Sequence, residues 1–415
     1  MPTPVILFDD AKGMLSPLTD LRPSFLVRTG AMTTAERLIA ALDLDPIAAV
    51  VPADLAELAS EQVSVPVNTV PEGDDTDEIL LINGRCVLPI DAIGALEPGH
   101  TLIECETQDM VAARLTRAGV RSLLTGTPPE MRTIEVADRV LMRRPWDWAH
   151  TLPQALAIDL AHVMTGPSAE PHVGVTVLGE HPVHVHPSAT VSPTAVLDAT
   201  AGPVVIDENA TVRPLAIIKG PAYIGPGSTV LDHALIKEKT AIGPVCKVAG
   251  EVGGTVFQGY ANKGHAGHLG DSWVGEWVNL GADTTNSNLL NTYTTIKLKP
   301  TPDASYEDTG LTFLGAVLGD HTKTAIATRI MTGAMVGTGT MHAATEPLGG
   351  WTAPYSWNTD AGTKPFRLGK FVEVAMTVMA RRGVQQSQAY ARRLTVLHER
   401  ATGTSSGMGW EGKPA

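Results

Sequence analysis

The sequence lacks several features that would assign the protein to a particular class. No apolar run reaches the roughly 18 residues of a membrane-spanning helix. The 3 cysteines, Cys86, Cys105 and Cys246, show no paired spacing, which favours a reducing cytoplasm over a disulfide framework. No basic run occurs and the net charge is −13, which argues against a nucleic-acid partner. We see no basic region with a cleavage site at the N-terminus, so we expect a cytoplasmic protein without a secretory signal or membrane partner.

The dominant positive feature is an aliphatic residue at every sixth position in the C-terminal half. A six-residue step fits neither a helix nor an ordinary strand, but it is typical of a parallel β-helix, in which each face supplies one short strand and one tight turn. The 40 glycines and 30 prolines concentrate between these positions, where they make the corners. The series comprises Val185, Val191, Leu197, Ile206, Val212, Ile218, Ile224, Val230, Ile236, Ile242 and Val248, then Val274 and Leu280, then Leu318, Thr324, Ile330 and Val336.

The first 170 residues alternate short apolar runs with helical stretches, which indicates an α/β domain with a mostly parallel sheet. The first helix has a capping signal, because Thr33 or Thr34 precedes Glu36. The predicted strands are Val5–Phe8, Ala48–Val51, Ile79–Ile82 and Ser122–Leu124. The predicted helices are Thr33–Leu42, Leu55–Glu61, Thr107–Ala118 and Pro145–Met164.

The composition suggests four segments along the 415 residues. Residues 249–273 and 286–316 break the six-residue phase, so we expect both to leave the coil. A helix over about 366–400, with Phe371, Val374, Val378 and Met379 on one face, should cap the coil or pack on a neighbouring subunit. The expected segments are an α/β domain (1–170), the β-helix (171–350), a C-terminal extension with a helix (351–402) and a disordered tail (403–415).

The segment from Gly264 to Asp283 resembles a known enzyme family. It reads G-H-x-x-x-L-G-D, then a hexad with V-N, then L-G-A, with Asn288 in the next turn. This pattern is similar to the acetyltransferase half of the bifunctional enzymes that make UDP-N-acetylglucosamine, namely UDP-N-acetylglucosamine pyrophosphorylase and glucosamine-1-phosphate N-acetyltransferase. The likeness is nearest to an uncharacterised bacterial subgroup described as sugar nucleotidyltransferases. It runs from Leu7-Phe8-Asp9-Asp10 to the C-terminal helix. The resemblance implies a left-handed coil, a homotrimer and acetyl-CoA as co-substrate.

The resemblance also implies roles for individual residues. Acetylation of an amine needs a base for the attacking nitrogen, and a neutral imidazole suits that task near pH 7. By this resemblance, His265 would be the base, Asn279 would bind the sugar, and Ala282 and Asn288 would contact acetyl-CoA. His268 replaces the sugar-contacting tyrosine of the family, and Lys263 and Arg213 are basic residues that could bind a phosphate. In such trimers the site lies between neighbouring coils.

The histidines allow a second interpretation. His265, His268 and His321 could form a zinc site across subunits, as in trimeric hexapeptide proteins related to carbonic anhydrase. An H-x-x-H pair in a glycine-rich segment is a weak signal for such a site.

The N-terminal segment resembles a nucleotidyltransferase that has lost functional groups. Pro17-Leu18-Thr19 and Arg22-Pro23 look like the P-L-T-x-x-R-P-K signature, but Ser24 replaces the lysine. Two aspartates, Asp9 and Asp10, stand where small residues should receive the phosphates. The family's N-G-D, whose carboxylate binds metal, reads Asn83-Gly84-Arg85 here. We therefore expect a degenerate site at Arg22, Asn83 and Arg85, with Mg²⁺ involved only if this domain is active.

The sequence thus supports three hypotheses. The first is an acyltransferase that acetylates an amino sugar or sugar phosphate, with a sugar phosphate or nucleotide sugar as ligand. The second is a sugar-1-phosphate nucleotidyltransferase with a rearranged site. The third is a trimeric protein that binds sugar nucleotides without catalysis.

Overall fold

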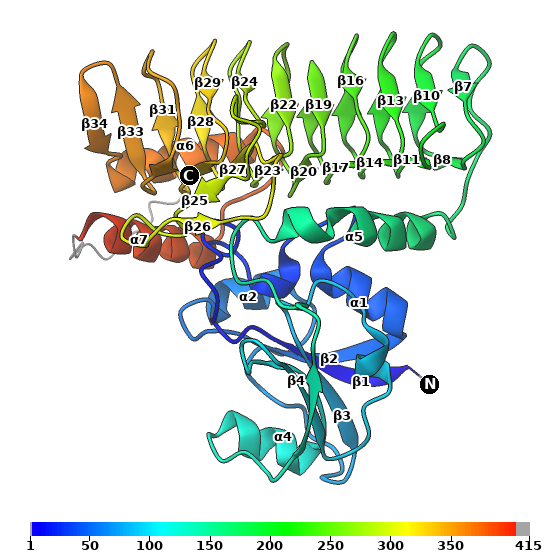
Figure 1. Ribbon diagram of the computed structural model, residues 1–415, viewed down its shortest axis with the longest axis vertical. Helices are drawn as coiled ribbons and strands as arrows, with labels where there is room; N and C mark the ends of the chain where they lie inside the picture. The colour runs from blue at the N-terminus through cyan, green and yellow to red at the C-terminus, as the bar shows by residue number, and fades with distance from the viewer. Residues whose placement is uncertain (1, 404–415) are drawn as a thin grey trace.

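A computed structural model describes residues 2–403 of the chain (Figure 1). The N-terminal part is a sheet flanked by helices, and the remainder is a long stack of short strands with two C-terminal helices beside it. No helix among the described residues is long and apolar enough to cross a membrane.

The N-terminal sheet is mostly parallel, as the sequence predicts. Within the described residues its order is β2-β1-β3-β5-β4-β6, and β5 alone runs antiparallel to its two neighbours. The strands are β1 (Thr3–Phe8), β2 (Leu44–Val50), β3 (Glu78–Asn83), β4 (His100–Glu104), β5 (Met110–Thr116) and β6 (Arg132–Val136). The helices are η1 (Ser24–Leu26), α1 (Thr34–Leu42), α2 (Ala56–Gln62), α3 (Asp91–Gly94), α4 (Arg117–Leu124) and α5 (Trp148–Val163).

Helix α1 begins where the sequence predicts. The Thr33 hydroxyl accepts a hydrogen bond from the Glu36 amide at 3.2 Å, and the Glu36 carboxylate accepts one from the Thr33 amide at 2.7 Å. The strands predicted near β1, β2 and β3 and the helices predicted near α2 and α5 are also confirmed.

Two predicted elements in this domain are wrong. Most of the segment 107–118, expected to be a helix, forms β5 (Met110–Thr116) between β3 and β4. Val111, Ala112, Ala113 and Leu115 are buried in the sheet, and the strand forms ladders with strands on both sides, which outweighs a helical spacing of the same residues. Ser122–Leu124, expected to be a strand, ends α4, which starts with a hydrogen bond from the Gly119 amide to the Thr116 hydroxyl.

The C-terminal half is a parallel coil with three faces. Val204 pairs with Ala222 and Ala222 with Thr240, so a regular turn takes 18 residues, or three hexads. The first face contains β7 (Thr176–Leu178), β10 (Val196–Asp198), β13 (Ile217–Lys219), β16 (Leu235–Ile236), β19 (Glu251–Gly253) and β22 (His268–Gly270). The second face contains β8 (Val183–Val185), β11 (Val204–Ile206), β14 (Ala222–Ile224), β17 (Thr240–Ile242), β20 (Val256–Phe257), β23 (Trp273–Val274), β27 (Ala316–Leu318), β30 (Ala334–Val336) and β32 (Trp351–Thr352). The third face contains β9 (Thr190–Val191), β12 (Thr211–Val212), β15 (Thr229–Val230), β18 (Lys247–Val248) and β21 (Asn262–Lys263).

Further strands extend the coil beyond β21 and β22. Asn279 bridges Asn262 to Lys323, and this links β21 to the later strands. The remaining strands are β24 (Thr285–Asn286), β25 (Lys297–Leu298), β26 (Glu307–Asp308), β28 (Lys323–Thr324), β29 (Arg329–Ile330), β31 (Met341–His342), β33 (Ser356–Thr359) and β34 (Gly362–Pro365).

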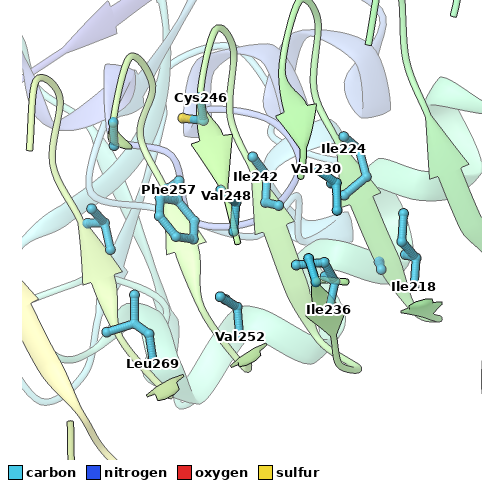
Figure 2. Close-up of a cluster of buried hydrophobic side chains, with 14 of the residues drawn as sticks. Ile218, Ile224, Val230, Ile236, Ile242, Cys246, Val248, Val252, Phe257 and Leu269 are labelled. Atoms are coloured by element: carbon cyan, nitrogen blue, oxygen red, sulfur yellow. The ribbon is translucent and has the colours of Figure 1, made fainter. Parts of the chain in front are cut away.

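The aliphatic series fills the interior of the coil, as predicted. Every aliphatic member from Val185 to Val336 is buried in one continuous cluster, and Thr324 is buried at the same kind of position. Figure 2 shows neighbouring members of this cluster, among them Ile224, Ile242 and Val248, stacked inside the coil. The six-residue period therefore encodes the core directly.

One predicted departure from the coil is confirmed and the other is wrong. Residues 249–273 stay in the coil as β19 to β22, in a shorter turn in which Ala241 pairs with Val256. Gly250 and Gly254, at φ of 73° and 58°, allow tighter corners here, so the period changes without the fold changing. Residues 286–316 do leave the coil and include the antiparallel pair β25–β26 before Val317 pairs with Trp273.

The N-terminal domain docks on the second face of the coil. Helix α5 lies along this face (Figure 1) and packs its apolar side against the outward side chains of β11, β14, β17, β20 and β23. The Trp273 indole donates a hydrogen bond to the Arg28 carbonyl at 3.0 Å. The first face lies on the opposite side of the coil from α5 (Figure 1).

The helix predicted over 366–400 is two helices, α6 (Leu368–Ala380) and α7 (Gln388–Thr402). The chain turns at Gly383, at φ of 72°, and Ser387 caps α7 by accepting from the Tyr390 amide. Phe371 and Met379 of the predicted apolar face are buried against the coil, while Val374 and Val378 are half-buried. Of the tail predicted to be disordered, residues 404–415 lie outside the described part of the chain.

Candidate functional site

The predicted nucleotidyltransferase residues Asn83 and Arg85 meet at the carboxyl ends of β1 and β3. Arg85, whose side chain is fully buried, binds Asp10 through Nε at 2.8 Å and Asp109 through a terminal nitrogen at 2.7 Å. Asn83 donates to the same Asp10 carboxylate at 2.9 Å. Lys12 forms an ion pair with the other oxygen of Asp109. Two carboxylates and two cations therefore form a closed network at this edge of the sheet.

This network does not fit a Mg²⁺ ion. Mg²⁺ needs free carboxylate oxygens, whereas those of Asp10 and Asp109 are already paired with Arg85 and Lys12. Partial burial of Asp109 opposes its ionisation, but hydrogen bonds from Lys12 and Arg85 outweigh that effect and lower its pKa. No group of three or more His, Cys, Asp or Glu side chains within residues 2–403 could hold a metal ion.

Arg22, also predicted at that site, lies elsewhere. Its guanidinium donates to the Leu18 carbonyl at 2.9 Å and to Asp320 of the coil at 2.8 Å, and lies 3.3 Å from Glu276. Burial opposes its charge, but the nearby carboxylates raise its pKa overall. Leu18 and Leu21 of the same loop are fully buried. The loop that resembles a phosphate-binding signature thus anchors the N-terminal domain to the coil, and we assign Arg22 that role instead.

The second group of predicted residues lies at the end of the third face and on the corner that leads to the first face. His265 is exposed in the turn between β21 and β22, and an added Cβ on Gly267 would strike the backbone of Thr284 in the next turn. Asn279 is exposed on that next turn and accepts a hydrogen bond from Asn262 at 2.8 Å. Ala282 follows on the same corner. The structure therefore stacks the His265 turn directly against the turn that carries Asn279 and Ala282.

His268 and Asn288 lie in a different place, an open pocket of about 380 Å³ toward the corner between the first and second faces. Asn288 donates to Asp271 at 2.6 Å, and burial raises the pKa of that carboxyl group. His268 Nδ1 lies 3.4 Å from Glu251. The pocket is also lined by Lys237, Glu238, Lys239, Gly253, Gly254, Gly270 and Phe313.

Several of these pocket residues were not predicted. Asp271 is the last residue of the G-H-x-x-x-L-G-D motif, and its place in that motif was the one sequence feature that could have indicated a role at the site. Phe313 belongs to the segment that leaves the coil between β24 and β27, and no spacing indicates where such a segment returns.

Arg213 and Lys263 are not part of either group. Arg213 is exposed, 3.4 Å from Asp232, and lies three strands from Gly264 along the third face, or about 14 Å at normal strand spacing. Lys263 is buried inside the coil, where its ammonium donates to three backbone carbonyls. We therefore do not retain Lys263 as a substrate ligand.

His321, the third histidine of the alternative zinc site, is not at the protein surface. It is buried, lies 2.8 Å from the Tyr390 hydroxyl through Nε2, and packs beside Phe371. Burial lowers its pKa well below the usual value, so the ring is neutral. Within the described chain, the three histidines do not gather into a metal site.

A family model described as sugar nucleotidyl transferase matches residues 5–167. The match covers the N-terminal sheet and α5, less than half of the chain, so it applies to this part alone. No curated protein has a significant match.

Among solved structures, the acetyltransferase domain of PglB from Neisseria gonorrhoeae FA1090, in complex with acetyl coenzyme A, is 12% identical. The alignment covers 88% of this chain and 100% of that chain, with a TM-score of 0.17. A mutant GDP-perosamine N-acetyl transferase from Caulobacter crescentus, in complex with CoA and GDP-perosamine, is 10% identical over 87% of this chain and 95% of that chain, with a TM-score of 0.14. TM-scores this low do not establish a common fold.

Proposed function

We propose that the protein transfers an acetyl group from acetyl-CoA to the amino group of an amino sugar or sugar phosphate. The observation that carries this proposal is the His265 turn, which lies against the turn bearing Asn279 and Ala282, in the order of the acetyltransferase motif. An exposed imidazole is free to take the proton of an attacking amine, and the neighbouring turn offers polar groups to orient the sugar.

The pocket beside His268 supports the same class of ligand. Lys237 and Lys239 supply positive charge for a phosphate, while Asp271 and Asn288 supply hydrogen-bonding groups for hydroxyls. Phe313, half-exposed at the rim, offers an apolar surface. Together they suit a polar, anionic molecule such as a sugar phosphate or nucleotide sugar, or the acyl donor itself.

We propose that a left-handed homotrimer completes the site. His265 and the pocket lie toward two different corners of one coil, so one chain does not bring them together. The N-terminal domain covers the second face, which leaves the first and third faces for neighbouring chains. The half-exposed Leu215 and Ile217, at a corner and on the first face, provide apolar surface for such a contact.

A thiol-release assay with acetyl-CoA and a panel of amino sugars and their phosphates tests the proposal. Wild type should release thiol with at least one acceptor, and His265→Ala should lose on the order of 100-fold or more in rate. His162→Ala, which removes an exposed histidine from α5, is the matched control and should behave as wild type. No thiol release with any acceptor would refute the proposed function. Full activity of His265→Ala would refute the role of His265 as the base.

The second candidate is a sugar-1-phosphate nucleotidyltransferase, favoured by the match over residues 5–167. The Arg85 network speaks against Mg²⁺-dependent chemistry there, and we propose that the N-terminal domain is inactive and retains at most ligand binding. Pyrophosphate release from any nucleoside triphosphate and sugar phosphate, with Mg²⁺ or Mn²⁺, would overturn this view. A rise in melting temperature with nucleotide sugars, without turnover of either kind, would instead indicate a non-catalytic binding protein.

A further inference from the structure

One lysine occupies a position of the coil interior that the repeat reserves for aliphatic side chains. Lys263 pairs with Val248 in register, and the same column contains Val191, Val212 and Val230. Lys263 is only 1% exposed to solvent. Among strands β9 to β21 of the third face, it is the one charged residue at an inward position. Burying a charged lysine here removes the hydration of its ammonium group, which is unfavourable, so hydrogen bonds inside the coil must offset that loss.

The ammonium group is fully engaged by backbone carbonyls. Nζ donates to Ala249 at 3.1 Å, His265 at 3.1 Å and Gly267 at 2.7 Å. These contacts use all three N–H groups of a charged lysine. Ala249 lies at this corner in one turn of the coil, and His265 and Gly267 lie at the same corner in the next turn. A single side chain therefore joins two successive turns from inside.

The surrounding backbone is shaped around this group. Gly250 and Gly267 have φ of 73° and 112°, and a Cβ added to Gly250 would lie 2.9 Å from Lys263 Nζ. Without the ammonium, the carbonyls of Ala249 and His265 would point into an apolar interior without this partner, which is unfavourable. Burial lowers the pKa of Lys263 to about 8, although the charge of Asp283 opposes this shift.

We propose that Lys263 is a positioning residue that fixes the 264–267 turn from within the coil and thereby holds the His265 imidazole in place. This inference rests on the proposed acetyl transfer for its catalytic consequence. Lys263 touches neither substrate nor acyl donor; it acts through the carbonyl of His265 itself.

Kinetics of Lys263→Met and Val248→Ala test this role. Methionine has a similar length but no donor, while Val248→Ala makes a neighbouring interior defect without touching the turn. Lys263→Met should lose on the order of 100-fold in kcat, with KM for acetyl-CoA changed less than about threefold, because misplacement of a base impairs chemistry more than binding. Lys263→Ala should recover part of its rate with ethylammonium, which can replace the missing group. Unchanged kcat in Lys263→Met, or equal losses in Val248→Ala and Lys263→Met without rescue, would overturn the inference.

Hydrogen exchange of the peptide over 249–269 provides a readout that does not need activity. Lys263→Met should speed exchange there by at least about tenfold, whereas Val248→Ala should leave the 264–268 portion unchanged. Unchanged exchange in Lys263→Met overturns the inference even if wild type is active. If the wild type shows no acetyl transfer, the proposed function and the catalytic consequence are both refuted. Faster exchange in Lys263→Met would then restrict Lys263 to a structural role.

Discussion

Replacing Arg22 with methionine should destabilise the contact between the N-terminal domain and the coil, and by an amount that depends on pH. The guanidinium is buried and is held by the Leu18 carbonyl, Asp320 and Glu276. Removing one partner of a buried ion pair typically costs about 3–5 kcal/mol, since the other charge stays buried. We expect a loss of that size at pH 8, where Asp320 is ionised.

The pH dependence follows from Asp320. Burial raises its pKa to about 6, against the opposing effect of Arg22, and removal of Arg22 should raise it further. A carboxyl group whose folded pKa exceeds its unfolded value of 3.8 costs stability above the folded pKa, and this cost disappears as the pH falls. The loss in Arg22→Met should therefore shrink between pH 8 and pH 5, by about 1.4 kcal/mol for each unit of added pKa shift.

Urea unfolding of wild type and Arg22→Met at both pH values, followed by tryptophan fluorescence, measures this difference. The control compares Arg22→Met/Asp320→Asn with Asp320→Asn alone, because both proteins lack the titrating group, and the loss between them should be the same at pH 5 and pH 8. A loss below about 1 kcal/mol, or an equal loss at both pH values in the single variant, would refute the reasoning.

Four further stability predictions concern other parts of the fold. Arg37→Met should lower the free energy of unfolding in urea by about 3–5 kcal/mol, because Arg37 and Asp159 form a fully buried ion pair at 2.7 Å. Adding Asp159→Leu should recover much of this loss, and additive losses in the double variant would contradict the reasoning. Phe257→Ala should cost about 3–5 kcal/mol by the same measurement, since the ring fills the coil interior. Gly315→Ala should cost about 1–3 kcal/mol or more, because an added Cβ would collide with a backbone carbonyl of the neighbouring turn. Gly369→Ala, with open space around it in α6, should be neutral or stabilising in thermal melts.

The sequence predicted which residues lie close together where they share neighbouring turns of the repeat, but not where distant segments meet, and the site itself remains a prediction. His265, Asn279 and Ala282 were predicted from one motif, and the coil stacks their turns because successive turns must lie one strand spacing apart. Their chemical roles remain predictions. The charge of Lys263 predicts a surface position, whereas its place in the repeat directs the side chain inward, where it is buried. The repeat position was the better guide.

The sequence by itself determined the coil, since a six-residue period places each aliphatic side chain inside and needs no information from elsewhere in the chain. The resemblance of the N-terminal segment to nucleotidyltransferases also predicts a degenerate site at Arg85, and this stays a prediction. Tertiary structure alone decided that the Arg22 loop faces Asp320, that residues 110–116 form a central strand, and that Phe313 borders the pocket near His268. Each of these depends on burial and hydrogen bonds between segments far apart in sequence, and a local pattern of residues does not encode which distant partner satisfies them.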